Sequence, residues 1–104
     1  MYLLGFDIGS SSVKAALVNT KNNKTVAVIQ YPSSEMSIDA PHPDWAEQSP
    51  ETWWKCVCKA SKKILKKHPK ATSKISAIGI AYQMHGLVLV DKEKKVLRLS
   101  LIHI

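Results

Sequence analysis

The sequence has no long hydrophobic run, and this lack excludes a helix that spans a membrane. Its apolar stretches fall well short of the roughly 18 residues that a helix needs to cross a bilayer. The apolar start of the chain, residues 1–6, is broken by Asp7 and lacks the basic region of a secretory signal. We therefore expect a cytoplasmic location and no membrane partner.

Arginine and cysteine are also scarce, although the chain is strongly basic. Arg98 is the only arginine among 15 basic residues, which outnumber 8 acidic residues and give a net charge of +7. Because arginine is the preferred side chain for reading bases, this lysine-rich composition argues against a nucleic-acid partner. Cys56 and Cys58 cannot form a disulfide framework, and on a helix they would point to opposite sides, away from a shared metal ion.

The length of 104 residues allows one small domain or a part of a larger one. Apolar runs of high β-propensity predict strands over residues 2–8, 13–19 and 25–31. Because a serine-rich turn and the polar turn 21–24 separate these runs, they should form an antiparallel meander. A proline-containing loop follows over residues 32–48.

A helix is predicted to begin at Pro50, with Ser49 as its N-cap, and to end near His68, just before Pro69. Apolar residues at helical spacing define its expected buried face: Trp53, Trp54, Val57, Ala60, Ile64 and Leu65. We expect its lysines to form a solvated face rather than a nucleic-acid or membrane surface: Lys55, Lys59, Lys62, Lys63, Lys66 and Lys67. The remaining pattern predicts strands over 75–81 and 87–91, turns over 82–86 and 92–95, and an extended run from Val96.

The stretch DIGSSSVK, residues 7–14, ends the first predicted strand with a carboxylate and continues into a turn rich in hydroxyl groups. Asp7 can sit near Mg²⁺ or a water bound to it, and Gly9 lets the backbone turn so that adjacent amides face an anion. Four further side chains can donate to phosphate oxygens: Ser10, Ser11, Ser12 and Lys14. The same residues also suit a plain hairpin turn, and neither G-x-x-x-x-G-K-[ST] nor G-x-G-x-x-G occurs in the chain.

Three blocks of the sequence together resemble one family. FDIGSSSVKAALVN is similar to the first hairpin of the sugar-kinase, hexokinase and actin superfamily. PHPDWAEQSPETWW is similar to the Pro-x-Trp-x-Glu-Gln-x-Pro-x-x-Trp-Trp hallmark of the FGGY carbohydrate kinases, and IGIAYQMHGLVLVD resembles a segment of the xylulokinases in that family. The blocks occur in the family's order between residues 2 and 98, so the chain resembles the amino-terminal part of a xylulokinase-like protein.

The resemblance implies an α/β fold class, namely a ribonuclease-H-like (actin-type ATPase) first domain. The domain would be incomplete, with an antiparallel three-strand meander, one amphipathic helix and further strands. The resemblance also implies a kinase that uses ATP and Mg²⁺ to convert D-xylulose to D-xylulose 5-phosphate, and it leaves open a homodimer of the full-length protein. The alternatives are a ribulose, gluconate or glycerol kinase of the same family, or a non-catalytic sugar- or nucleotide-binding module of the same fold.

Site residues follow from the resemblance by their positions in the motifs. It implies contact with the nucleotide phosphates or magnesium for Asp7, Gly9, Ser10, Ser11, Ser12 and Lys14, with Asp7 nearest the metal. It implies contact with the sugar for Gln83, Met84 and His85. Trp45, in the loop, is left open between sugar stacking and packing. The family's catalytic aspartate and adenine-binding domain lie beyond residue 104, so we expect no catalytic residue in this chain and no activity from it alone.

The sequence departs from the family after residue 98, where relatives continue with a proline and an apolar strand. Residues 99–104 read LSLIHI, which is what CTG TCT CTT ATA CAC ATC encodes, the transposon end used as an adaptor in sequencing libraries. We therefore expect residues 1–98 to be the amino-terminal part of the first FGGY domain and residues 99–104 to be adaptor-derived. A genuine strand is the alternative, because the six residues alternate well.

Overall fold

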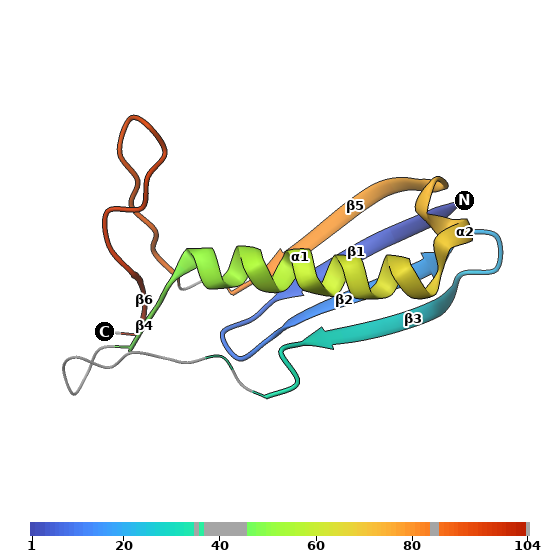
Figure 1. Ribbon diagram of the computed structural model, residues 1–104, viewed down its shortest axis with the longest axis horizontal. Coiled ribbons are helices and arrows are strands. Elements are labelled where there is room, and N and C mark those ends of the chain that lie inside the picture. The colour runs from blue at the N-terminus through green and yellow to red at the C-terminus, as the bar shows by residue number, and fades with distance from the viewer. Residues whose placement is uncertain (35, 37–45, 84–85, 104) are drawn as a thin grey trace.

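The computed structural model contains a four-stranded sheet, a long helix packed on one of its faces, and an arm that extends from one end (Figure 1). It describes residues 1–34, 36, 46–83 and 86–103. The elements in chain order are β1 (Tyr2–Ile8), β2 (Val13–Asn19), β3 (Lys24–Tyr31), β4 (Ala46–Gln48), α1 (Pro50–Lys67), α2 (Pro69–Thr72), β5 (Ile75–Tyr82) and β6 (Ser100–His103).

The sheet is built on a meander of three antiparallel strands, with β5 added in parallel beside β1. The strand order is β3-β2-β1-β5, so β1 is a central strand. Ile8, the last residue of β1, lies opposite Val13 of β2 on one side and Tyr82 of β5 on the other. A parallel neighbour requires a crossover connection, and α1 with α2 provides it. The predicted meander and helix are confirmed.

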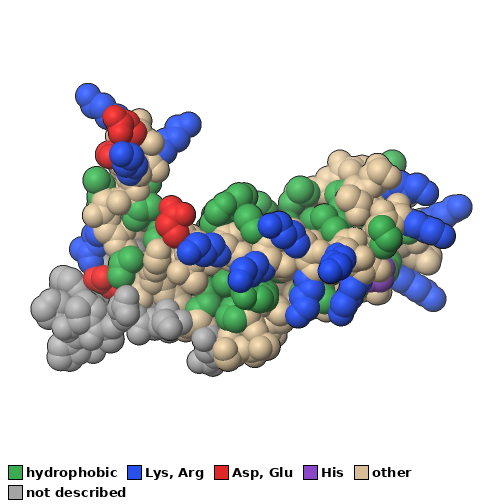
Figure 2. All heavy atoms as spheres, in the orientation of Figure 1, with side chains coloured by type: hydrophobic (Ala, Val, Ile, Leu, Met, Phe, Trp, Pro, Cys, Tyr) green, Lys and Arg blue, Asp and Glu red, His purple; other side chains and the backbone are tan. Residues whose placement is uncertain are grey.

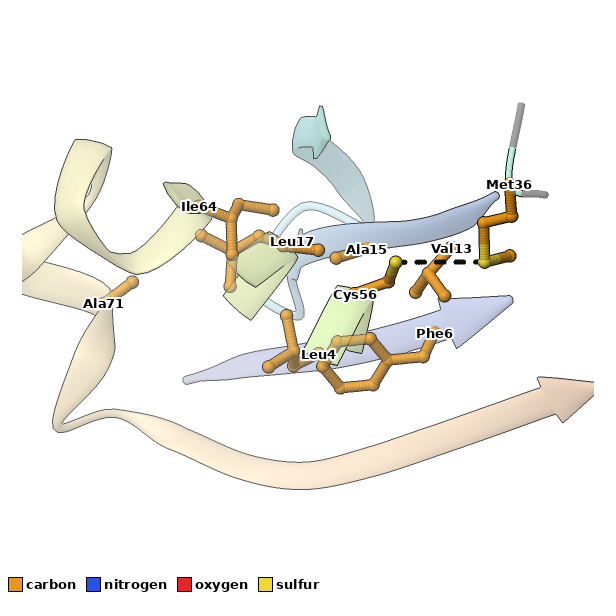
Figure 3. Close-up of a cluster of buried hydrophobic side chains, with 10 residues drawn as sticks. Leu4, Phe6, Val13, Ala15, Leu17, Met36, Cys56, Ile64 and Ala71 are labelled. Carbon is orange, nitrogen blue, oxygen red and sulfur yellow. Dashed lines mark hydrogen bonds between the residues drawn. The ribbon is translucent and has the colours of Figure 1, made fainter. Parts of the chain in front are cut away.

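The hydrophobic core lies between the sheet and α1, and every second residue of the first two strands points into it (Figure 3). These residues are Leu4, Phe6, Val13, Ala15 and Leu17. From the helix come Cys56, Ala60 and Ile64, whose spacing of four places them on one face. The sulfur of Met36 lies 3.8 Å from the sulfur of Cys56 and closes one end of the core. Core packing therefore fixes the sheet where β1 and β2 meet.

The outer surface of α1 is basic, as the sequence predicted. All six lysines of the expected solvated face are exposed, and basic side chains are spaced along the visible face of the helix in Figure 2. The expected burial of Trp54 is wrong, because its side chain is 64% exposed. Two positions on a helix correspond to a rotation of about 200°, so Trp54 points away from the face that Cys56 buries. Trp53 is half-buried and packs against the core.

The arm consists of residues 86–99 together with the small two-stranded sheet of β4 and β6. The predicted strand over residues 87–91 is wrong, because the described residues there form isolated bridges at Leu87 and Val90, the latter with Val96, and no strand. The predicted turn at 92–95 is present, and it is held by the Asp91 carboxylate, which accepts from the N–H groups of Glu93 and Lys95 at 2.9 Å each. Asp91 therefore has a local structural role.

The sheet face opposite α1 carries no described element, and part of the other face is also uncovered. α1 packs on β2 and β3, which leaves β5 bare beside it. Ile78, Ile80 and Tyr82 of β5 are 60–70% exposed although they share the helix side with Leu4 and Phe6. Within the described ranges, no helix is long and apolar enough to cross a membrane.

Candidate functional site

The two segments predicted to bind ligands meet where β1 and β5 end. Parallel neighbours place their carboxyl ends at the same edge of a sheet, and binding sites of open α/β sheets form at that edge. The main-chain N–H of Gln83 donates to the carbonyl of Ile8 at 3.1 Å, one residue before the turn that joins β1 to β2. The turn and the start of the 83–86 segment are therefore direct neighbours.

The turn of residues 9–12, here called the serine turn, closes tightly. The N–H of Gly9 donates to the carbonyl of Ser12 at 3.0 Å. A Cβ atom at position 9 would lie 3.2 Å from that carbonyl oxygen, which is closer than ordinary contacts allow. Glycine is therefore favoured here, because any other residue would require the two backbone segments to move slightly apart. The Ser12 side chain is buried in the turn, whereas Ser11 is exposed.

All three serine carbonyls of the turn are bonded to the protein. The Ser12 carbonyl accepts from Gly9, and the Ser11 carbonyl accepts from the N–H of Met36 at 2.8 Å. The Ser10 carbonyl accepts from the side-chain Nε2 of Gln48. In the described part of the chain, no acceptor is found for the N–H groups of the three serines. The serine carbonyls are thus bonded within the protein while the three N–H groups have no acceptor among the described residues, which makes the turn a candidate anion-binding nest.

Gln48 reaches the turn from the short strand β4, directly before α1. Its side chain is only 3% exposed. Besides donating to Ser10, it accepts at Oε1 from the indole Nε1 of Trp53 at 3.0 Å. The sequence interpretation gave Gln48 no role and gave Trp53 only a place on the buried face of the helix, although both belong to the Trp-x-Glu-Gln-x-Pro-x-x-Trp-Trp motif. That motif was the available signal, but identity alone could not say what the glutamine contacts.

Asp7 and Lys14 lie directly opposite each other on β1 and β2, two pairs before the serine turn. Both are exposed on the sheet face away from α1, because Phe6 and Ala15 beside them point into the core. The structure records no ion pair between these two described side chains. They border a shallow hollow of about 510 Å³ over the open face, whose floor includes Gly5 and Gly79. A carboxylate and an ammonium group are therefore free to act on a ligand at this hollow.

A magnesium ion has one candidate ligand at this edge of the sheet. The described residues contain no cluster of three His, Cys, Asp or Glu side chains that could form an all-protein cage. Mg²⁺ in phosphoryl-transfer sites is usually held by one or two carboxylates, several waters and the substrate phosphates. Asp7, exposed beside the serine turn, fits that kind of site.

The sugar-binding prediction is only partly within the described structure, because Met84 and His85 lie outside it. Gln83 is half-buried, and its Nε2 atom is buried with no hydrogen-bond partner in the described part of the chain. A buried amide donor without a partner costs free energy, so an acceptor from a ligand would offset that cost. Trp45, which the sequence left open between sugar stacking and packing, also lies outside the described residues.

Next to Gln48, a buried carboxylate is held by the arm. Glu47 is 8% exposed, and its Oε1 accepts from Nη2 of Arg98. A buried charge is tolerated when it is paired and hydrogen-bonded. This ion pair links β4 to Arg98 at the end of the arm, and so helps to fix the strand from which Gln48 projects.

Comparison with known proteins gives one consistent family. Residues 2–102 match the N-terminal domain of the FGGY family of carbohydrate kinases. The chain is 38% identical over 98 residues to the xylulose kinase of Escherichia coli (strain K12), covering 94% of this chain and 19% of that protein. It is 33% identical over 94 residues to the gluconokinase of Bacillus subtilis (strain 168), covering 90% of this chain and 17% of that protein.

The fold gives the same family. A crystal structure of a xylulose kinase from Brucella ovis superposes with a TM-score of 0.88 at 38% identity, covering 97% of this chain and 20% of that one. The chain therefore spans about a fifth of the length of these relatives. The predicted resemblance and the predicted fold class are both confirmed.

Proposed function

Because the chain belongs to the FGGY family of carbohydrate kinases, we propose that the full-length kinase transfers the γ-phosphoryl group of ATP to a hydroxyl of D-xylulose. The two relatives of 38% and 40% identity over 94% of the chain are named xylulose kinases, and this supports the choice of sugar. Relatives named gluconokinase at 33% identity make gluconate the second candidate.

The observation that carries this proposal is the serine turn. Three successive carbonyls are bonded to the protein, and the amides of Ser10, Ser11 and Ser12 have no acceptor among the described residues. A row of free amides beside an exposed ammonium group suits a polyphosphate, because it supplies donors and positive charge without a P-loop. We assign Asp7 to the magnesium of the nucleotide and Lys14 to its phosphates.

Phosphoryl transfer is catalysed mainly by positioning and by stabilisation of charge on the phosphate oxygens. In this proposal the serine turn and Lys14 orient the phosphates, and Asp7 holds the metal through an oxygen ligand. When bound, Mg²⁺ would neutralise negative charge on the phosphate oxygens. Gln83, Met84 and His85 are assigned to the sugar, and because Gln83 directly follows β5, donor and acceptor would meet at the edge shared by β1 and β5.

The catalytic base and the adenine site are assigned to the part of the kinase beyond these 104 residues. The isolated chain is therefore expected to be inactive. The cytoplasmic location, the homodimer and the absence of a nucleic-acid partner stay predictions.

The test is an ADP-release assay on the full-length kinase with ATP, Mg²⁺ and one sugar at a time. We expect the highest kcat/KM with D-xylulose, and lower values with ribulose, gluconate and glycerol. A preference for gluconate would show that the proposed sugar is wrong, whereas the proposed phosphoryl transfer from ATP would stand. Nucleotide or sugar binding without turnover would favour the alternative of a non-catalytic binding module.

A further inference from the structure

The buried amide of Gln48 is oriented by two partners that lie in the described part of the chain, the Ser10 carbonyl and the Trp53 indole. A carbonyl oxygen only accepts and an indole N–H only donates, so the amide must present Nε2 to Ser10 and Oε1 to Trp53. Reversing the amide would break both bonds. At 3% exposure, Gln48 cannot replace these partners with bulk water. Its amide is therefore held in one orientation.

The bond to Ser10 also sets the direction of a neighbouring N–H. The carbonyl of Ser10 and the N–H of Ser11 belong to one planar peptide unit, and in a trans peptide the two groups point in opposite directions. The cis bond recorded in the chain lies elsewhere, between Tyr31 and Pro32. Holding the Ser10 carbonyl inward therefore turns the Ser11 N–H outward, to the side where a ligand would sit.

Gln48 is the one side chain among the three anchors of the serine carbonyls, since the other two donors are backbone N–H groups. Its partner Trp53 lies in the first turn of α1 and packs against the core. The bond thus joins the turn to the helix, which packs on β2 and β3. Without it, the peptide between Ser10 and Ser11 would have no described bond that fixes its plane.

We propose that Gln48, oriented by Trp53, is a positioning residue of the nucleotide site that aims the Ser11 amide at a phosphate of Mg·ATP. This inference rests on the proposed function. Preorganised amides are effective because they need no reorientation when the phosphate binds or reacts. Gln48 itself would not touch the nucleotide, and it would act through the plane of one peptide.

The test uses the full-length kinase with three substitutions: Gln48→Leu, Gln48→Glu and Trp53→Phe. Gln48→Leu removes both bonds at similar volume, and Trp53→Phe removes only the indole donor. We expect Gln48→Leu to weaken Mg·ADP binding, measured by calorimetry without sugar, by about tenfold, since one hydrogen bond is worth roughly that factor. Trp53→Phe should cost about threefold, and the KM for the sugar should change by less than about twofold in both.

Gln48→Glu separates positioning from a merely structural role through its pH profile. A carboxylate cannot donate to the Ser10 carbonyl, whereas a protonated carboxyl group can. The affinity of this variant for Mg·ADP, relative to the unsubstituted kinase at each pH, should therefore recover as pH falls from 8 towards 5.5. Trp54→Phe is the matched control, because Trp54 is the neighbouring, exposed tryptophan, and it should bind Mg·ADP normally.

The outcomes distinguish this inference from the proposed function. An active kinase whose Gln48→Leu and Gln48→Glu variants keep normal affinity for Mg·ADP would overturn the positioning role and leave the function intact. Equal losses for nucleotide and sugar would also overturn it. If Gln48→Leu fails to fold, the positioning role is decided by the pH profile of Gln48→Glu and by the comparison of Trp53→Phe with Trp54→Phe. A kinase that binds Mg·ADP but phosphorylates no sugar would refute the function, and the positioning role would still be tested by binding.

Discussion

The carbonyl of Ile8 accepts a hydrogen bond of 3.1 Å from the N–H of Gln83, which joins the end of β1 to the residue after β5. One residue beyond Ile8 begins the serine turn, and Gln83 is the first of the three residues to which the resemblance gives contact with the sugar. Two stretches about 75 positions apart are thereby held together by the parallel register of β1 and β5. Substitutions in the two stretches should nevertheless have separable effects.

We predict that Asp7→Ala and His85→Ala in the full-length kinase impair the use of different substrates, the nucleotide in the first case and the sugar in the second. Asp7→Ala should raise the Mg²⁺ and ATP concentrations needed for half-maximal rate, because a candidate metal ligand is lost. His85→Ala should raise the KM for the sugar, since an unpaired polar site costs about 1–3 kcal/mol. Steady-state kinetics with each substrate varied in turn measures both effects.

The result that would contradict this prediction is a loss confined to nucleotide use in both variants. Asp91→Ala serves as a control for removing a carboxylate, because Asp91 only holds the turn of the arm. It should leave the KM values for ATP and sugar unchanged.

Gln83→Leu is predicted to have opposite effects on stability and on sugar binding. The Nε2 atom of Gln83 is buried without a partner in the described part of the chain, so replacing the amide with an apolar side chain should raise the free energy of unfolding slightly, by up to about 1 kcal/mol. Sugar affinity should fall by about tenfold because a donor is lost. Melting curves and calorimetry on the full-length kinase measure the two effects, and Gln30→Leu, at an exposed position, is the control. Lower stability with normal sugar binding would mean that the amide is structural.

Local sequence patterns were sufficient for most of the fold. The strands predicted over 2–8 and 13–19 have those bounds, and the helix begins at Pro50 as predicted. These elements are set by short-range periodicity and by glycine and proline. The prediction of a strand over 87–91 was wrong because, in the described part of the chain, this run pairs only with the short stretch 95–97 across its turn, and β-propensity does not reveal how long a partner is. The burial of Trp54 was predicted from its apolar character alone. Which positions of α1 are covered depends instead on how the helix lies over the sheet, and Trp54 is on the uncovered side.

The sequence predicted the residues of the serine turn, but it did not predict the long-range contacts that hold this turn in place. Gly9 and the serines could be assigned from their order along the chain, since a turn is a local structure. The contact between Gln48 and Ser10 spans 38 positions, and the bond between Glu47 and Arg98 spans 51. No local period encodes such contacts. They depend on how β4 is placed against the end of the sheet.

Cys56 is predicted to react with alkylating reagents much more slowly than Cys58. Burial raises the pKa of the Cys56 thiol, and the charge of Lys59 opposes this only in part. Cys56 is buried in the core, whereas Cys58 is partly exposed. Iodoacetamide at pH 8, followed by mass spectrometry, should label Cys58 first, by at least about tenfold. Equal labelling at both sites would show that the core opens readily.

The same pKa shift gives a direction for stability against pH. A thiol whose pKa is raised in the folded state contributes its full stability below the ordinary thiol pKa of about 8.5, and that contribution is lost as pH rises through the higher folded value. Unfolding free energies between pH 7.5 and 10.5 should therefore fall less steeply in Cys56→Ala than in the unsubstituted chain, with Cys58→Ala as the control.

Deleting residues 99–104 is predicted to leave the main sheet intact, in keeping with the proposal that these residues are adaptor-derived. Among the described strands β6 pairs with β4 alone, in a sheet separate from β1, β2, β3 and β5. The melting temperature of residues 1–98 should stay within about 4 °C of that of the whole chain, a change of under about 1 kcal/mol. Adding Arg98→Ala to the shortened chain should lower it further, because the buried carboxylate of Glu47 loses its partner. Reading the source DNA without a transposon-based library decides the origin, and codons for LSLIHI in that DNA would refute the proposal.

The isolated 104-residue chain is predicted to self-associate through the uncovered side of β5. Ile78 and Ile80 are 60% and 61% exposed, and they lie beside a sheet edge with unpaired backbone groups. Replacing both with lysine should shift the chain towards a monomer, because neither side chain is needed in the core and two charges oppose edge-to-edge contact. Light scattering across a concentration series measures the mass. Leu97→Lys, which changes an equally exposed residue on the arm, should leave association unchanged. A monomeric unsubstituted chain with a sharp, cooperative thermal transition would contradict the prediction. It would show that the chain folds stably with the side chains and edge of β5 exposed to solvent.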